Sequence, residues 1–139
     1  MFILGVPLLI FAFAIYNMVA FLLPGTNWNE ALVRFSMVSG APWSLSIGDL
    51  MVAGSIFILL IELMKSARIA RRSIIDHILS LILFIGMLVE FLLVPQAATA
   101  TFFLLLVISF VDVAGGFAIS VQAAQRSIGF TGVENIHQD

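Results

Sequence analysis

The stretch 101-TFFLLLVISFVDVAGGFAISVQAA-124 decides the fold, because it is long and apolar enough to cross a lipid bilayer. At about 1.5 Å of rise per residue, a helix of this length spans the hydrocarbon layer of roughly 30 Å. One acid, Asp112, lies near its middle, where an ionised carboxylate facing lipid costs about 2.5–3.5 kcal/mol. We therefore expect Asp112 to face protein or trapped water.

The composition of the whole chain is that of an integral membrane protein. Of its 139 residues, 62% are hydrophobic and only 10% are charged, whereas soluble domains are about 25% charged. The formal net charge of -2 and the lack of a basic, aromatic-interleaved surface argue against nucleic-acid binding. The chain contains no cysteine, which excludes disulfides, thiol chemistry and cysteine-ligated metals. We expect no cofactor.

Three further apolar segments precede this stretch, separated by turn residues and charges. Together they predict an all-α, four-helix membrane bundle with spans at about 2–23, 46–64, 74–94 and 101–124. Pro24-Gly25 ends the first segment, and Pro95 opens a short hairpin connection between the last two spans. The membrane domain is therefore expected over residues 1–126, followed by a polar, loosely ordered cytoplasmic tail over 127–139.

The longest connection, between the first two spans, has the pattern of a short amphipathic helix. Asn27 and Glu30 have the spacing of a helix cap, and apolar residues then recur at helical intervals. We predict a surface helix at about 27–38, with Trp28 and Trp43 as interfacial anchors. The alternative is that this helix only caps the bundle.

Basic residues between the second and third spans set the predicted orientation. Four of the six Lys and Arg residues lie there, namely Lys65, Arg68, Arg71 and Arg72. By the positive-inside rule, this loop and both termini face the cytoplasm, and the short loops favour a bacterial inner membrane. The cluster also suits anionic lipid headgroups, although setting the orientation is enough to explain it.

Six polar side chains fall at three depths inside the predicted bundle. From the outer to the inner side these are Asn17 with Glu90, Ser55 with Asp112, and Glu62 with His77. They form either interhelical hydrogen bonds or the steps of a proton or ion path. Because the layers are about 8–10 Å apart along the helix axes, a path would need a chain of water molecules. We therefore favour interhelical hydrogen bonds.

Two acids match the pattern of helix caps, and small residues mark close packing. Asp49 and Asp76 each lie three residues after a serine, as in a capping box. The small residues within the predicted spans are Gly54, Gly86, Gly115, Gly116 and Ser120. Such residues let helix backbones approach closely, either within the bundle or between copies of the chain. A bend at Gly115-Gly116 is a further hypothesis.

No catalytic constellation is present in the sequence. No serine, histidine and acid share a depth, and the chain has no metal-binding helix motif or phosphate loop. We therefore expect a non-enzymatic membrane protein, most simply an accessory, assembly or scaffold subunit of a membrane complex. Its partners would be membrane lipids and either a second copy or another membrane protein. The alternative is a small oligomeric proton-coupled transporter or channel that uses Asp112, with Glu90 and Glu62 at its mouths.

Overall fold

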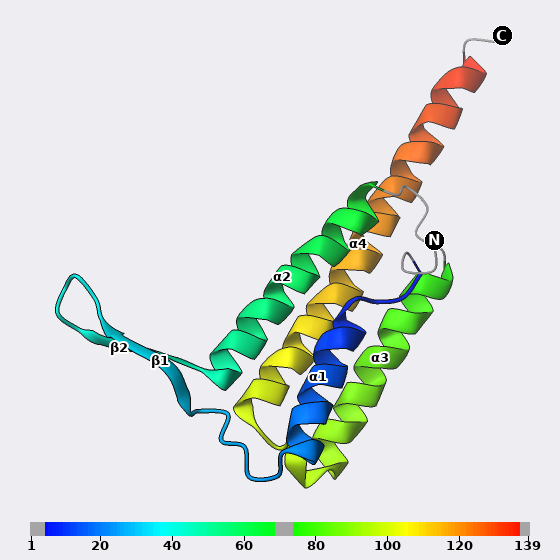
Figure 1. The fold of residues 1–139 in the computed structure, drawn as a ribbon. Coiled ribbons are helices and arrows are strands. Elements are labelled where there is room, and N and C mark those ends of the chain that lie inside the picture. The colour runs from blue at the N-terminus through cyan, green and yellow to red at the C-terminus, as the bar shows by residue number, and fades with distance from the viewer. Residues whose placement is uncertain (1–4, 69–73, 137–139) are drawn as a thin grey trace.

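The computed structural model describes residues 5–68 and 74–136, which form a helical bundle with a projecting β-hairpin (Figure 1). In chain order the elements are α1 (Leu9–Leu22), β1 (Ala31–Ser36), β2 (Pro42–Ser46), α2 (Ile47–Arg68), α3 (Ile74–Leu93), the 3-10 turn η2 (Pro95–Ala97) and α4 (Ala100–Ile136). The fold is thus mostly helical, as predicted, but it is not all-α, because β1 and β2 pair as an antiparallel hairpin.

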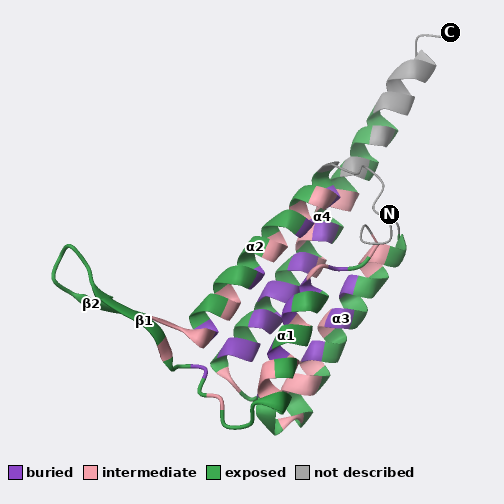
Figure 2. Ribbon diagram, in the orientation of Figure 1, coloured by how far each residue is buried: buried purple, intermediate pink, exposed green. Residues whose placement is uncertain are grey.

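Three of the described helices are long and apolar enough to cross a membrane. They are Ile47–Ala67 in α2, Ile74–Leu93 in α3 and Ala100–Arg126 in α4. Their outer faces are largely exposed (Figure 2) and carry large apolar side chains such as Phe57, which is 68% exposed. Monomeric soluble proteins do not expose so much contiguous apolar surface. This distribution indicates a membrane location.

The helix α4 is the centre of the bundle. Both α2 and α3 pack along it, and α1 contacts α2 and α4 (Figure 1). The core at one end is aromatic, because the ring of Phe102 on α4 lies against Phe13 and Tyr16 on α1 and Phe91 on α3. The rest of the core runs down α4 through Leu105, Leu106 and Ile108.

The first helix is shorter than predicted. Instead of starting near Phe2, α1 begins at Leu9 and has 14 residues, about 21 Å of helix, which is less than the hydrocarbon thickness. Pro7 explains the late start, because proline lacks a backbone donor and disfavours helical backbone in the residue before it. Residues 1–4, the beginning of the predicted span, lie outside the described residues.

The predicted surface helix at 27–38 is wrong, and a β-hairpin stands in its place. Its register pairs Val33 with Leu45 and Phe35 with Trp43. The turn between the strands is closed by a hydrogen bond of 2.9 Å from the Met37 amide to the Ala41 carbonyl. Gly40 supplies the positive φ of +85° that this turn requires, which glycine adopts without steric cost.

The second and fourth helices extend beyond their predicted ends. α2 begins with the predicted capping box, in which the Ser46 amide donates to Asp49 and the Asp49 amide donates to Ser46 Oγ, at 2.9 and 3.1 Å. α4 continues to Ile136, so the prediction of a loosely ordered tail from residue 127 is wrong. No proline interrupts this segment, and α4 is also continuous through Gly115-Gly116, where a bend was a hypothesis. The cap predicted at Asp76 involves Ser73, which lies outside the described residues.

Candidate functional site in the polar interior of the bundle

The start of α1 lies inside the protein, where the carboxylate of Glu62 on α2 binds it. The Leu8 amide, at the N-cap of α1, donates to Glu62 Oε2 at 3.0 Å. Anions are favoured at this position, because the first amides of a helix have no intrahelical acceptors. Glu62 is only 3% exposed, and the Lys65 ammonium lies 3.9 Å from the same oxygen. Glu62 thus binds the first helix to the second and also pairs with Lys65 on its own helix.

Asp112 is buried near the middle of the apolar part of α4, Ala100–Arg126, with 1% of its surface exposed. Ser109 and Gly116 are buried on the same face of the helix, so this face points into the bundle. Ser55, expected at the same depth, is also buried, but its hydroxyl donates to the Met51 carbonyl of its own helix at 2.7 Å. The structure therefore agrees with an Asp112 that faces protein.

His77 and Ser120 join α3 to α4 nearer the end of the bundle from which α4 projects. The Nε2 atom of His77 and the Oγ atom of Ser120 are 2.7 Å apart. The sequence predicts His77 at the depth of Glu62 and predicts a packing role for Ser120. In the structure Glu62 on α2 bonds to the start of α1, and His77 on α3 bonds to Ser120 on α4. The first contact joins α1 to α2, and the second joins α3 to α4.

Asn17 and Glu90 join α1 to α3 at the opposite end, as their common depth predicts. The amide of Asn17 donates to Glu90 Oε2 at 3.3 Å and also to the Phe13 carbonyl at 3.2 Å. The remaining oxygens, Asn17 Oδ1 and Glu90 Oε1, are buried and accept no hydrogen bond from any described residue. Each could bind a water molecule or take part in a protonated carboxyl contact.

Tyr16 forms a junction that the sequence analysis missed. Its side chain is fully buried, and its hydroxyl donates to the Gln96 carbonyl at 3.0 Å and contacts Thr99 Oγ1 at 2.6 Å. Its ring stacks on Trp28 with 4.4 Å between the centroids. Tyr16 therefore joins α1, the connection to the hairpin and the turn between α3 and α4. Its partners lie up to 83 residues away in sequence, so no local pattern could have identified them.

The two tryptophans predicted as interfacial anchors have different environments. Trp28 is packed against Tyr16 inside the protein and is only 8% exposed. Its carbonyl accepts a hydrogen bond of 2.8 Å from the Gly48 amide at the start of α2. Trp43 lies on the hairpin and is exposed. Only Trp43 is therefore available to contact a membrane surface.

The small residues divide into two groups. Gly115 and Gly116 face the interior, and a Cβ atom added to Gly115 would lie 3.0 Å from Leu63 Cδ2. Gly54 on α2 and Gly86 on α3 are exposed, and added Cβ atoms there would meet no atom within 4 Å. An apolar groove of about 270 Å³ runs between α1 and α2 beside Gly54. The first group serves packing within the bundle, and the second leaves its outer surface open.

The predicted basic cluster is only partly described. Lys65 is half-buried and pairs with Glu62, whereas the side chain of Arg68 and residues 71 and 72 lie outside what the structure describes. Within the described residues, no three His, Cys, Asp or Glu side chains are grouped so that they could hold a metal ion. Among the described polar contacts of the interior, those of Glu62 with Leu8, of Asn17 with Glu90 and of His77 with Ser120 link helices.

In comparisons with known proteins, no family model, no curated protein and no solved structure matches this chain.

Proposed function

We propose that this chain is a non-enzymatic integral membrane protein that acts as an accessory, assembly or scaffold subunit of a membrane complex. The observation that supports this role is how the interior polar groups are used. The Asn17–Glu90, His77–Ser120 and Leu8–Glu62 bonds each tie one helix to another. Polar groups used in this way stabilise a particular arrangement of helices, which is what a subunit that works through its surfaces needs.

The proposed topology has four crossings, with both termini in the cytoplasm. α1 and the residues before it form the first crossing, and the Leu8 amide at the start of α1 is satisfied by Glu62 rather than left to face lipid. Gly5 lies beside the first turn of α3, because an added Cβ would be 3.3 Å from Asp76 Oδ1. The far end of α4 lies at this same end of the bundle (Figure 1). The basic cluster Lys65, Arg68, Arg71 and Arg72 assigns this end to the cytoplasmic face of a bacterial inner membrane.

The outer surfaces at Gly54 and Gly86 support a partner that approaches as a helix. Glycine on an exposed helix face lets a second backbone come close, so that packing contacts replace those with lipid. The groove beside Gly54 is lined by α1 and α2 residues such as Ile15, Leu50 and Ile58, and it is almost wholly apolar. A transmembrane helix of another membrane protein would fill it.

Photo-crosslinking in the native membrane tests this proposal. One photoreactive residue is placed at Leu50, which lines the groove. The control probe is placed at Leu81, which lies about 140° around α3 from Gly86 and so faces away from the proposed partner surface. We expect the Leu50 probe to give a protein adduct and the Leu81 probe to give lipid adducts. Filling the groove by Gly54→Leu should remove the protein adduct. Lipid adducts alone at Leu50 would contradict the proposal.

A second candidate function is proton-coupled transport. Asp112 is a carboxylate buried in the central helix, and the buried oxygens of Asn17 and Glu90 that accept no hydrogen bond from described residues offer places for water. Proton flux into liposomes separates the candidates. The transport function predicts a flux that Asp112→Asn abolishes. The accessory role predicts no flux above that of empty liposomes for either protein.

A further inference from the structure

The hairpin formed by β1 and β2 is amphipathic across its two faces. Side chains alternate between the faces of a strand, and paired residues lie on the same face. One face carries the pairs Val33–Leu45 and Phe35–Trp43, and the other carries Arg34–Ser44 and Ser36–Pro42. The rings of Phe35 and Trp43 lie 5.0 Å apart. One face is therefore apolar and aromatic, and the other carries a charge and hydroxyl groups.

No part of the described chain covers the apolar face of the hairpin. Val33, Phe35 and Trp43 are all exposed, as are Met37 and Val38 at its tip. An isolated two-stranded hairpin is marginally stable in water, and it gains stability when an apolar face is buried. Nothing within the described protein buries this face, so any burial of it has to come from outside the described residues.

The hairpin is held at the end of the bundle by fixed contacts. β2 runs directly into α2, the Ile47 amide donates to the Glu30 carbonyl at 3.2 Å, and the Gly48 amide donates to Trp28. From this root the hairpin projects sideways from the bundle (Figure 1). It therefore lies beside the outer face of α2, where exposed Leu50 and Phe57 would contact lipid.

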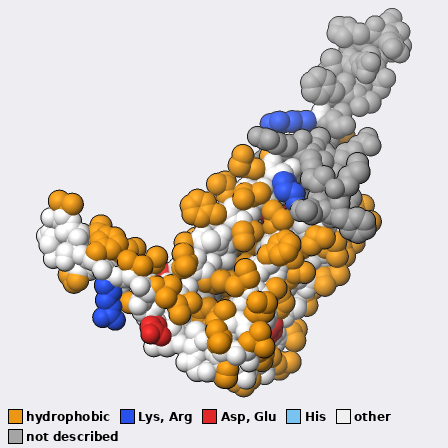
Figure 3. Space-filling model, viewed as in Figure 1, with side chains coloured by type: hydrophobic (Ala, Val, Ile, Leu, Met, Phe, Trp, Pro, Cys, Tyr) orange, Lys and Arg blue, Asp and Glu red, His pale blue; other side chains and the backbone are white. Residues whose placement is uncertain are grey.

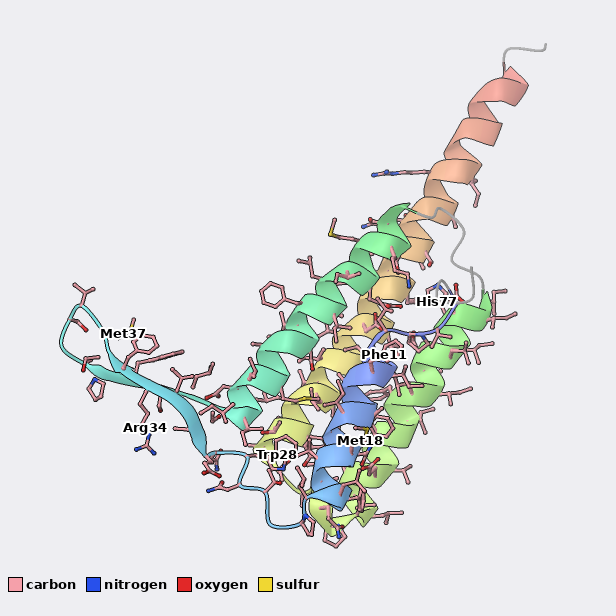
Figure 4. All side chains as sticks on the ribbon, in the orientation of Figure 1. Phe11, Met18, Trp28, Arg34, Met37 and His77 are labelled. Atoms are coloured by element: carbon pink, nitrogen blue, oxygen red, sulfur yellow. The ribbon has the colours of Figure 1, made fainter. Side chains whose placement is uncertain are left out.

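The two faces of the hairpin are oriented relative to the bundle. Met37 lies on the side of the hairpin toward which the helices extend, and Arg34 points away from it (Figure 4). In the space-filling view, apolar side chains lie along the hairpin and a basic side chain protrudes from one side of it (Figure 3). In a bilayer, the apolar side is thus directed toward hydrocarbon and the charged side toward water or headgroups.

We propose that the hairpin, residues 31–46, is a lipid-binding element that lies in the outer interface of the membrane. Its apolar face covers the acyl chains beside α2, Trp43 lies at headgroup level, and Arg34 is available to lipid phosphate. Aromatic side chains favour this layer, and guanidinium groups form charge-assisted hydrogen bonds to phosphate. The apolar face points in the direction in which the helices extend, and the charged face points the opposite way. A lipid bilayer requires this orientation relative to the helices, whereas a protein partner would not, so the arrangement favours a lipid surface.

This inference rests on the membrane location in the proposed function, and one experiment tests the two separately. Because the chain has no cysteine, a single introduced cysteine can carry a nitroxide without any native cysteine having to be removed first. Labels at Val33 and Phe35 report on the apolar face, labels at Arg34 and Ser44 on the polar face, and a label at Phe57 on α2. The protein is placed in vesicles of phosphatidylcholine and phosphatidylglycerol, and spin relaxation by oxygen and by a water-soluble nickel chelate is measured.

We expect the Val33 and Phe35 labels to be relaxed by oxygen, the Arg34 and Ser44 labels by nickel, and the Phe57 label by oxygen. If the Phe57 label is in lipid but all four hairpin labels are relaxed by nickel, the hairpin lies in water and the inference fails. Apolar-face labels shielded from both reagents would show a protein cover, including a second copy, and would equally overturn it. A Phe57 label relaxed by nickel would instead reject the membrane location itself.

Discussion

At the scale of single residues, a few polar side chains each join distant parts of the chain. Tyr16 is one of these, because it bonds to Gln96 and Thr99 and stacks on Trp28. Asn17, the next residue, bonds to Glu90 on a third helix. The short helix α1 is thus fixed by its polar contacts as well as by its apolar ones.

Tyr16→Phe should destabilise the bundle by about 1–2 kcal/mol. The ring and its stacking on Trp28 remain, but the hydrogen bonds to the Gln96 carbonyl and the Thr99 hydroxyl are lost, and each such bond contributes about 0.5–1.5 kcal/mol net. Unfolding in mixed detergent micelles, followed by circular dichroism, gives the change. Ile15→Val, on the exposed side of α1, is the matched control and should change stability little. An unchanged Tyr16→Phe protein would contradict this role.

A double-mutant cycle on Asn17 and Glu90 should give a favourable coupling energy of about 0.6 kcal/mol, the average for interhelical hydrogen bonds in membranes. The variants are Asn17→Leu, Glu90→Leu and the double substitution, all measured in the same unfolding assay. Glu90→Gln should retain most of the coupling, because its carbonyl oxygen still accepts from the Asn17 amide. Additive effects of the two substitutions would mean that the bond of 3.3 Å contributes nothing.

The depth of these polar residues could be predicted from the sequence, but most of their partners could not. Counting residues along the predicted spans paired Asn17 with Glu90 correctly, since both lie near the same end of their helices. The same counting could not predict that Glu62 binds the Leu8 amide, because that contact exists only when α1 begins after Pro7. The rotation of each helix about its own axis decides such contacts, and it is set by the packing of the whole bundle.

At the scale of secondary structure, the connection between α1 and α2 shows how two periodicities compete. Asn27 and Glu30 resemble a helix cap, but Asn27 Oδ1 accepts from the Asn29 amide at 3.1 Å and forms a local turn instead. The alternation of apolar and polar residues from Val33 to Met37 and from Trp43 to Ser46 is the signal for strands. The turn residues around Gly40 between these two runs predict a hairpin, and this pattern outweighs the helical one.

Gly40→Ala should weaken the hairpin without disturbing the helices. An L-residue in the left-handed conformation at φ +85° costs about 1–2 kcal/mol. Amide hydrogen exchange at Met37, whose amide bonds to Ala41, should therefore be faster by roughly 5- to 30-fold. Gly54→Ala is the control, since Gly54 lies in open space on α2. Equal exchange at Met37 in both variants would show that the turn has another conformation.

The glycines of α2 and α4 should respond differently to substitution. Gly54→Ala adds a methyl group in open space, and the gain in helix propensity of up to about 1 kcal/mol should leave the isolated protein as stable or more stable. Gly115→Leu should destabilise it by about 1–3 kcal/mol, because the added side chain meets Leu63 in the packed interior. Unfolding in micelles compares the two. A destabilised Gly54→Ala protein would mean that its surface is already covered.

At the scale of the whole molecule, the apolar segments and their boundaries were the part most readily predicted. Spans two to four appear as α2, α3 and α4, because runs of apolar residues bounded by charges and prolines determine them. The ends were less predictable: α1 starts late at Pro7, and α4 continues well past Arg126. The whole molecule is thus a helical bundle that internal hydrogen bonds hold together. It has exposed glycines on its outer helix surfaces and a β-hairpin fixed at one end.

The central claim is that this protein acts through contact with another membrane protein. Native mass spectrometry of the protein, extracted gently from its own membrane, tests it most directly. The account predicts a reproducible complex whose mass includes a second, different protein, and predicts that Gly54→Leu lowers its yield while Gly54→Ala lowers it less. Monomers or homo-oligomers alone, found in both wild-type and variant preparations, would contradict the claim.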